Sequence, residues 1–238
     1  MDYLNLTLPT LAENLALDEA LLLHAEAGAG GEVLRSWEWP AWGVVLGAGG
    51  KLAEDVDERA CLAHGVSIHR RASGGGTVLL GPGCLAFTLI LNYQRAAELD
   101  DIRSSYGFIL DRVRGALADA VPGLASAGIS DLAIHGRKCS GNSQQRKRHY
   151  LLHHGTLLYD FAVEHVAKYL RMPQRQPEYR HQRGHADFLT NLPLSALELR
   201  RRLRGSWQAD VPLDAWPEDL VRQLVAEKYS RPKWVRRR

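Results

Sequence analysis

The sequence predicts an α+β protein built on one main sheet that is mostly antiparallel. Strand-like runs follow one another in hairpin-like pairs, as at 77–80 and 84–91 on either side of the turn Gly81-Pro82-Gly83. Helical patterns are present, but they do not alternate regularly with strands, as a doubly wound parallel sheet would require. The 238 residues contain no internal repeat or low-complexity linker and suit one large domain, or one domain with a small appendage.

Helical periodicity is strongest in residues 10–27 and 104–120, and a further helix is predicted over 53–64. Thr10 is a plausible N-cap for the first helix, in which Leu11, Leu15 and Leu22 recur near helical spacing. The stretch 136–146 is rich in small and polar residues and is expected to be a loop between two strands. The predicted strands are 32–37, 42–46, 66–70, 77–80, 84–91, 131–135 and 150–159, with short helices near 163–171, 196–203 and 218–228.

Composition excludes several classes of protein. The net charge of +3 is too small to indicate nucleic-acid binding by itself. No apolar run approaches the roughly 18 residues that span a bilayer, so no membrane partner is expected. The three cysteines (Cys61, Cys84, Cys139) are too few and too widely spaced for a disulfide framework. The first residues lack the features of a signal peptide, which predicts a cytoplasmic protein.

The most informative local stretch is Arg70-Arg71-Ala72-Ser73-Gly74-Gly75-Gly76-Thr77. Successive glycines let the backbone approach a ligand closely and present N–H groups to an anion, and two arginines add positive charge. A mobile turn beside two solvated arginines is the alternative interpretation. The stretch matches neither nucleotide motif, and Gly50-Lys51 fails as a P-loop because Val45 and Leu52 occupy required positions.

Two further polar stretches are candidates for a site. Lys138 lies in Gly136–Gln144 and could stabilise negative charge on a carboxylate or phosphate. The alternative interpretation is a solvent-exposed lysine without a function. Cys139 adjoins Lys138, which could activate it as a nucleophile. His149 and His153 have helical i, i+4 spacing, but their strand-like surroundings favour a core or ligand-bonding histidine over a metal site.

Taken in order, four stretches resemble the lipoate–protein ligase family, within the wider biotin/lipoate ligase and octanoyltransferase superfamily. The resemblance extends over about residues 1–190, and the order and spacing of the four stretches make it specific. The matching segments are Leu17-Asp18-Glu19-Ala20-Leu21, Arg70–Val78, Gly136-Arg137-Lys138-Cys139-Ser140-Gly141-Asn142 and His153-His154-Gly155-Thr156-Leu157-Leu158.

The resemblance implies the fold shared by biotin and lipoate ligases and class II aminoacyl-tRNA synthetases, a mainly antiparallel sheet flanked by helices. It implies that lipoate and ATP, with Mg²⁺, form lipoyl-adenylate, and that a lysine of a lipoyl domain then takes the acyl group. Lys138 would be the catalytic residue, and Asp131 would lie near the phosphates and the metal. Substrate- or nucleotide-binding residues by analogy are Arg70, Arg71, Ser73, Gly74, Gly75, Gly76, Thr77, Val78, Asp131, Ser140, Gly141, Asn142, His153, His154, Gly155 and Thr156.

The resemblance also implies a domain division and two alternative functions. Residues 1–192 would form the catalytic domain, and 193–238 a short helical extension that is a reduced form of the accessory element of many ligases. A separate accessory chain is the other possibility. An octanoyltransferase would move octanoyl from acyl carrier protein through a cysteine thioester, but no cysteine occurs in 122–130 or after Cys139. A non-catalytic lipoyl-domain-binding protein is the second alternative.

Overall fold

An eight-stranded mixed sheet forms the centre of the computed structural model, which describes all residues from Met1 to Arg238. The strand order is β11-β1-β2-β6-β10-β9-β8-β7. Neighbours from β2 to β7 are antiparallel, whereas β1 is parallel to both β2 and β11. The strands are β1 (Asp2–Asn5), β2 (Val33–Glu38), β6 (Cys84–Asn92), β7 (Leu124–Ala127), β8 (Asp131–Ile134), β9 (Arg137–Arg146), β10 (Tyr150–Leu158) and β11 (Val211–Pro212).

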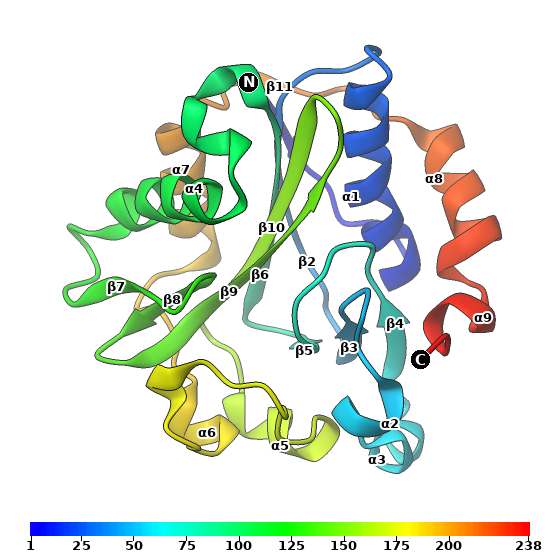
Figure 1. The fold of residues 1–238 in the computed structure, drawn as a ribbon, viewed down its shortest axis with the longest axis vertical. Coiled ribbons are helices and arrows are strands. Elements are labelled where there is room, and N and C mark those ends of the chain that lie inside the picture. The colour runs from blue at the N-terminus through cyan, green and yellow to red at the C-terminus, as the bar shows by residue number, and fades with distance from the viewer.

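Helices cover both faces of this sheet (Figure 1). α1 (Leu11–Glu26) and α8 (Glu218–Leu224) lie on one face, and α4 (Ile102–Leu117) and α7 (Ala196–Trp207) lie on the other. β6 alternates between the faces: Leu85, Phe87 and Leu89 belong to the core under α4, while Ala86 and Ile90 belong to the core under α1. The predicted α+β class is therefore confirmed, with a sheet that is antiparallel except at β1.

A second, three-stranded sheet carries the glycine-rich segment. Its order is β4 (Ser67–Arg70), β3 (Gly43–Leu46), β5 (Val78–Leu80), so the glycines connect its two outer strands. Short helices surround it and the neighbouring edge of the large sheet: α2 (Leu52–Asp55), α3 (Glu58–Ala63), α5 (Val166–Tyr169), α6 (His185–Phe188) and α9 (Pro232–Val235), with short 3₁₀ turns elsewhere.

Three sequence-based expectations about local structure are wrong. The strands 77–80 and 84–91, expected as a hairpin-like pair, lie in different sheets as β5 and β6 and do not pair, because β5 pairs with β3 and β6 pairs with β2 and β10. The expected loop 136–146 is strand β9, which pairs with both β8 and β10; polar residues on both of its faces contact other groups, so no apolar alternation marks it. The single helix expected over 53–64 is two helices, because Val56 takes an extended conformation and Asp57 starts α3 as its N-cap. Strands β1, β7 and β11 were not predicted.

The predicted C-terminal extension packs against both faces of the large sheet. Trp207 of α7 is buried in the core under α4. Beyond α8, the π-helical turn Val225–Tyr229 contacts α1, where Lys228 forms an ion pair of 2.7 Å with Glu19 and the Tyr229 hydroxyl donates to the same carboxylate at 2.8 Å. The division at residue 192 stays a prediction. None of the helices combines the length and apolar character needed to cross a bilayer.

Candidate active site

Lys138 is held by a buried carboxylate beside a large cavity. Its ammonium Nζ lies 2.8 Å from Asp131 Oδ1, and the Tyr179 hydroxyl donates to Asp131 Oδ2 at 2.7 Å. Burial and the neighbouring Asp131 charge both raise the pKa of Tyr179, so it remains a neutral donor. The Lys138 side chain keeps 27% of its surface exposed. The three groups therefore fix a cation that still faces the cavity.

The local course of β8 and β9 explains this position. A register shift between Leu132 and Ala133 places Lys138 opposite Ala133, while Asp131 pairs with Gly141. A Cβ atom on Gly141 would come within 2.7 Å of Lys138 Nζ. Glycine at this position thus leaves the space that the lysine head occupies.

The cavity beside Lys138 has a volume of about 1140 Å³ and contains several basic groups. One wall comes from the end of the glycine-rich segment, and another from residues 171–189, which also supply Tyr179. Positive charge in the lining exceeds negative charge, which suits a ligand with an anionic part. Of the predicted residues, Gly76, Thr77, Val78, Asp131, Lys138, Ser140, Gly141 and Thr156 line it; its other charged side chains are Asp55, Arg103, Arg171, Arg175, Glu178 and Arg180.

Arg71 binds the glycine-rich segment rather than the cavity. Its Nε donates to Ser73 Oγ at 2.9 Å, and its terminal nitrogens donate to the carbonyls of Gly76 at 2.9 Å and Val45 at 3.3 Å. Burial lowers the pKa of this guanidinium to about 10. Gly75 lies in the left-handed region, with φ of +80°, which a residue with a side chain would rarely adopt. Arg71 thus stabilises an unusual backbone.

Arg70 points away from the glycine-rich segment and binds the C-terminal segment, which here means residues 234–235. Its guanidinium is fully buried and donates to the carbonyls of Gly47 at 2.9 Å, Gly50 at 2.7 Å and Val235 at 2.8 Å. The Trp234 indole N–H donates to the Arg70 carbonyl at 2.9 Å. The structure therefore does not bring Arg70 to the cavity lining, and its predicted contact with a ligand stays a prediction.

Ser73 belongs to a buried chain of polar groups under the glycine-rich segment. Ser73 Oγ lies 2.5 Å from His154 Nε2, and His154 Nδ1 lies 3.3 Å from Asp18 Oδ2. Asp18 also forms an ion pair of 2.5 Å with Arg35. Burial raises the pKa of the Asp18 carboxyl, but Arg35 and His154 together lower it by more, so the pKa lies below its usual value. Asn14 accepts from Arg35 through its carbonyl and its side chain, at 2.9 and 2.6 Å.

His153 and Gly155 face the other side of the sheet. His153 is fully buried between Gln144 Nε2 and Asn142 Oδ1, each at 3.2 Å, and burial lowers its pKa to about 3. A Cβ on Gly155 would lie 1.9 Å from Asn142 Oδ1. His153 is thus the core histidine that one sequence interpretation favoured, and the ligand contacts predicted for His153, Gly155 and Asn142 stay predictions.

The cysteines are unsuited to nucleophilic catalysis. All three are buried, and Cys139 faces the core under α4, opposite to the lysine before it, with its Sγ 3.4 Å from the Leu132 carbonyl. Burial raises the pKa of Cys139 to about 12 despite the adjacent Lys138. The expectation that Lys138 could activate Cys139 is therefore wrong, because successive strand residues point to opposite faces.

The residues present do not form a magnesium site of their own. No three His, Cys, Asp or Glu side chains come together in a way that could hold a metal ion. Both oxygens of Asp131, the predicted metal contact, already accept from Lys138 and Tyr179. Magnesium would have to arrive with a nucleotide substrate.

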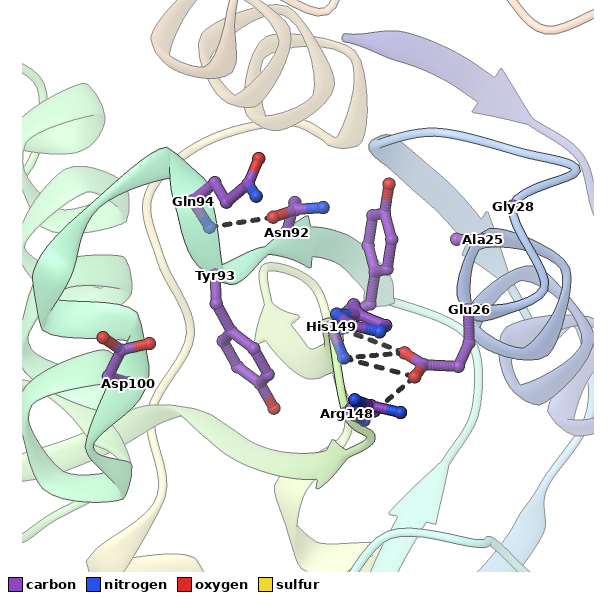
Figure 2. Close-up of a pocket in the computed structure, with 10 residues that line it drawn as sticks. Ala25, Glu26, Gly28, Asn92, Tyr93, Gln94, Asp100, Arg148 and His149 are labelled. Atoms are coloured by element: carbon purple, nitrogen blue, oxygen red, sulfur yellow. Dashed lines mark hydrogen bonds between the residues drawn. The ribbon is translucent and has the colours of Figure 1, made fainter.

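A smaller pocket of about 400 Å³ lies near the turn between β9 and β10 (Figure 2). The Glu26 carboxylate, at the end of α1, accepts backbone N–H groups of Arg148, His149 and Tyr150 at 3.0–3.2 Å. None of the predicted site residues lines this pocket. Glu26 here fixes the hairpin turn, so the pocket is a consequence of how the turn is held.

Tyr179, Asp18 and Arg35 are not among the site residues that the sequence predicts. Asp18 sits in a helix that is rich in leucine and alanine and mostly buried, and a charge in such a helix indicates a buried partner. Tyr179 lies in a stretch rich in arginine and histidine that has no regular periodicity. Neither signal identifies the partner, because each partner is distant in sequence.

The fold is that of lipoate-protein ligases. A structure of lipoate-protein ligase A bound with ATP superposes with a TM-score of 0.83 at 21% identity, covering 99% of both chains. A bi-partite lipoate protein ligase from Thermoplasma acidophilum gives 0.82 at 21% identity, over 99% of this chain and 95% of that one. The model of the lipoyl protein ligase A/B catalytic domain matches residues 10–197, and the chain belongs to this family. The predicted family is thus confirmed, and the chain is an enzyme of the lipoate ligase and octanoyltransferase group.

Relatives within the family differ in their named activity. The octanoyltransferase LipM of Carboxydothermus hydrogenoformans is 27% identical over 254 residues, which cover 94% of each chain. The lipoate-protein ligase LplJ of Bacillus subtilis is 29% identical over 137 residues, which cover 57% of this chain and 39% of LplJ. These matches agree better with the octanoyltransferase alternative than with the ATP-dependent ligase.

Proposed function

We propose that this enzyme is an octanoyltransferase that moves an octanoyl group from acyl carrier protein to a lysine of a lipoyl domain. The observation that carries the proposal is Lys138, held by Asp131 and Tyr179 beside a cavity large enough for an acyl donor. The match to LipM over 94% of both chains supports the choice of donor.

The chemistry needs a cation at the place where Lys138 lies. Attack on a thioester carbonyl puts negative charge on its oxygen, and a preorganised donor stabilises this charge most in a partly desolvated site. Lys138 Nζ can supply such a donor without rearrangement, because Asp131 and Tyr179 already hold it. The product is an amide on the acceptor lysine, with the carrier thiol as the leaving group.

An ATP-dependent lipoate–protein ligase is the second candidate. The burial of all three cysteines favours it, since an adenylate needs no enzyme thiol, and the arginines of the cavity suit phosphate groups. In this case lipoate and ATP, with the magnesium that ATP brings, would form lipoyl-adenylate. Lys138 would then stabilise charge between the carboxylate and the phosphate, and a separate accessory chain could be required.

The intact mass of an apo lipoyl domain separates the two candidates. The domain is incubated with this protein and octanoyl–acyl carrier protein without ATP, with lipoate and Mg·ATP, or with preformed lipoyl-adenylate. We expect one octanoyl group to be added in the first reaction. A gain only with lipoate and Mg·ATP would replace the proposal with the ligase, and a gain only with the adenylate would indicate a missing accessory chain.

A Lys138→Met variant tests whether the same site performs the reaction. Octanoyl transfer is expected to fall by about 10²–10³-fold in this variant while the chain still folds. Undiminished transfer would overturn the assignment of Lys138, and no transfer by either protein would overturn the proposed function.

A further inference from the structure

The hydrogen-bonded groups Ser73, His154 and Asp18 beneath the glycine-rich segment are ordered so that a proton could pass from Ser73 to His154. Asp18, paired with Arg35, is an acceptor, so His154 presents its Nδ1–H to Asp18 and leaves Nε2 to accept the Ser73 hydroxyl proton at 2.5 Å. Serine, histidine and aspartate in this sequence of contacts are what general-base activation of a serine requires.

Donors for a developing oxyanion lie directly after this serine. The backbone N–H groups of Gly74, Gly75 and Gly76 donate to no acceptor within the chain, and all three glycines are exposed. Backbone N–H groups next to a nucleophile are the usual means of stabilising a tetrahedral intermediate. The Arg71 Nε–H, 2.9 Å from Ser73 Oγ, further favours negative charge on that oxygen.

The chain offers no thiol that could carry the acyl group instead. Cys61, Cys84 and Cys139 are 1%, 2% and 0% exposed, and no cysteine lies next to Ser73, His154 or Lys138 on their face of the sheet. An octanoyltransferase with a covalent intermediate would therefore need another nucleophile.

We propose that Ser73 is this nucleophile and carries the octanoyl group as an oxygen ester during transfer, an inference that rests on the proposed function. Ser73 Oγ attacks the thioester carbonyl of octanoyl–acyl carrier protein while its proton passes to His154 Nε2. The C–S bond then breaks, and the proton leaves with the carrier thiol. The neutral amine of the acceptor lysine attacks the ester, the C–O bond breaks, and a proton from the amine returns to Ser73 through His154.

Access to Ser73 requires a shift of the glycine-rich segment. Ser73 is 2% exposed and lies beneath the exposed Gly74–Gly76, of which Gly76 lines the large cavity. Glycines have the widest choice of backbone conformations, so this segment can be displaced toward the cavity once the Gly74 carbonyl is released by its donors Arg71 and Ser143. Asp18 and Arg35 are positioning residues in this scheme, since they act only through His154.

The test is to trap the acyl-enzyme in the absence of acceptor. The full chain is mixed with octanoyl–acyl carrier protein, quenched in acid and weighed intact, and the adduct is mapped to a peptide. We expect one octanoyl group on the peptide that contains Ser73. Ser73→Ala should lose the adduct and slow transfer to the lipoyl domain by roughly 10³-fold or more, whereas Ser73→Cys should restore an adduct as a thioester.

Two outcomes separate this proposal from the proposed function. Transfer to the lipoyl domain that persists undiminished in Ser73→Ala, or an adduct mapped to another residue, would overturn the serine intermediate and leave the octanoyltransferase intact. No transfer from the carrier by the native chain would overturn both. A variant with alanine at Cys61, Cys84 and Cys139 should keep the adduct, and the mapped peptide of the native chain decides the matter if that variant fails to fold.

Discussion

Two ion pairs on the same side of the large sheet have opposite characters. Arg35 and Asp18 have side-chain exposures of 0% and 4%, and nearly every polar atom of the pair has a partner in α1, Leu6 or His154. Lys138 and Asp131 have exposures of 27% and 8%, and the ammonium still faces the cavity. Both members of the Arg35–Asp18 pair are enclosed by other protein groups, whereas in the Lys138–Asp131 pair only the carboxylate is enclosed.

The difference shows what each pair can do. A fully enclosed pair cannot exchange partners without unfolding, so Arg35 and Asp18 fix geometry. A cation that is held by one carboxylate but open to a cavity can bind a further anion at little cost. The Arg35–Asp18 pair is therefore a rigid support, and Lys138 is a charge that can bind a ligand. Each can be altered by mutation without changing the other.

The largest expected effect comes from opening the closed pair. Arg35→Met should lower the free energy of unfolding by about 3–5 kcal/mol, because it leaves Asp18 buried without its main counter-ion. Urea unfolding measures this change. Arg222→Met is the matched control, because that arginine pairs with Asp219 and Glu218 at the exposed surface, and it should change stability by less than about 1 kcal/mol. Equal losses in the two variants would contradict the distinction between the pairs.

Removing the open cation should affect activity more than stability, because Asp131 keeps the Tyr179 hydroxyl as a donor. Lys138→Met is expected to reduce the rate of acyl transfer by about 10²–10³-fold, the usual cost of losing one charge-stabilising donor. Transfer to a lipoyl domain gives the rate, and thermal unfolding provides the control. A variant with reduced thermal stability but a normal rate of acyl transfer would show that Lys138 has a structural role, like Arg35 and Asp18.

His153 should contribute to the change in the free energy of unfolding with pH. Because burial lowers its folded-state pKa to about 3, the unfolded chain binds more protons, and stability falls as pH decreases from about 6.5 toward 3. His153→Gln should remove up to about 1.4 kcal/mol per pH unit of this slope. Unfolding measured between pH 4 and 7 tests it, with the exposed His64→Gln as control. Parallel curves for the native chain and His153→Gln would refute the expectation.

The smallest effect is expected from Tyr179→Phe. This change removes one donor to Asp131 but keeps the ring and the ion pair, so transfer should slow by roughly 3- to 10-fold, equivalent to about 1 kcal/mol. Steady-state rates of transfer measured over a range of pH test this prediction. A range of pH is needed because the loss of the Tyr179 donor frees one Asp131 oxygen and so alters how the carboxylate holds Lys138. An effect as large as that of Lys138→Met would mean that Tyr179 itself contacts the reacting group.

The sequence predicts features that depend on near neighbours. The first helix and the strands 77–80 and 84–91 lie within about two residues of their predicted bounds, but the two strands belong to different sheets and do not form a hairpin. Strand β9 was missed because its polar residues are buried against groups far along the chain, which no local pattern reveals. Adjacent residues also diverge: Arg70 and Arg71 look equivalent in sequence, but the strand's alternation sends one to the C-terminal segment and the other to the glycines.

The contact between Arg70 and Val235 spans 165 positions of the chain, which has a consequence for biosynthesis. At a translation rate of roughly 5–20 residues per second, Val235 is made on the order of ten seconds or more after Arg70. Both sheets can form in that interval, but the Arg70 guanidinium has yet to meet one of its acceptors. The glycine-rich segment therefore reaches this support only after residue 235 has been made, and a ribosome stalled shortly before residue 235 would hold the Arg70 guanidinium with this acceptor still missing.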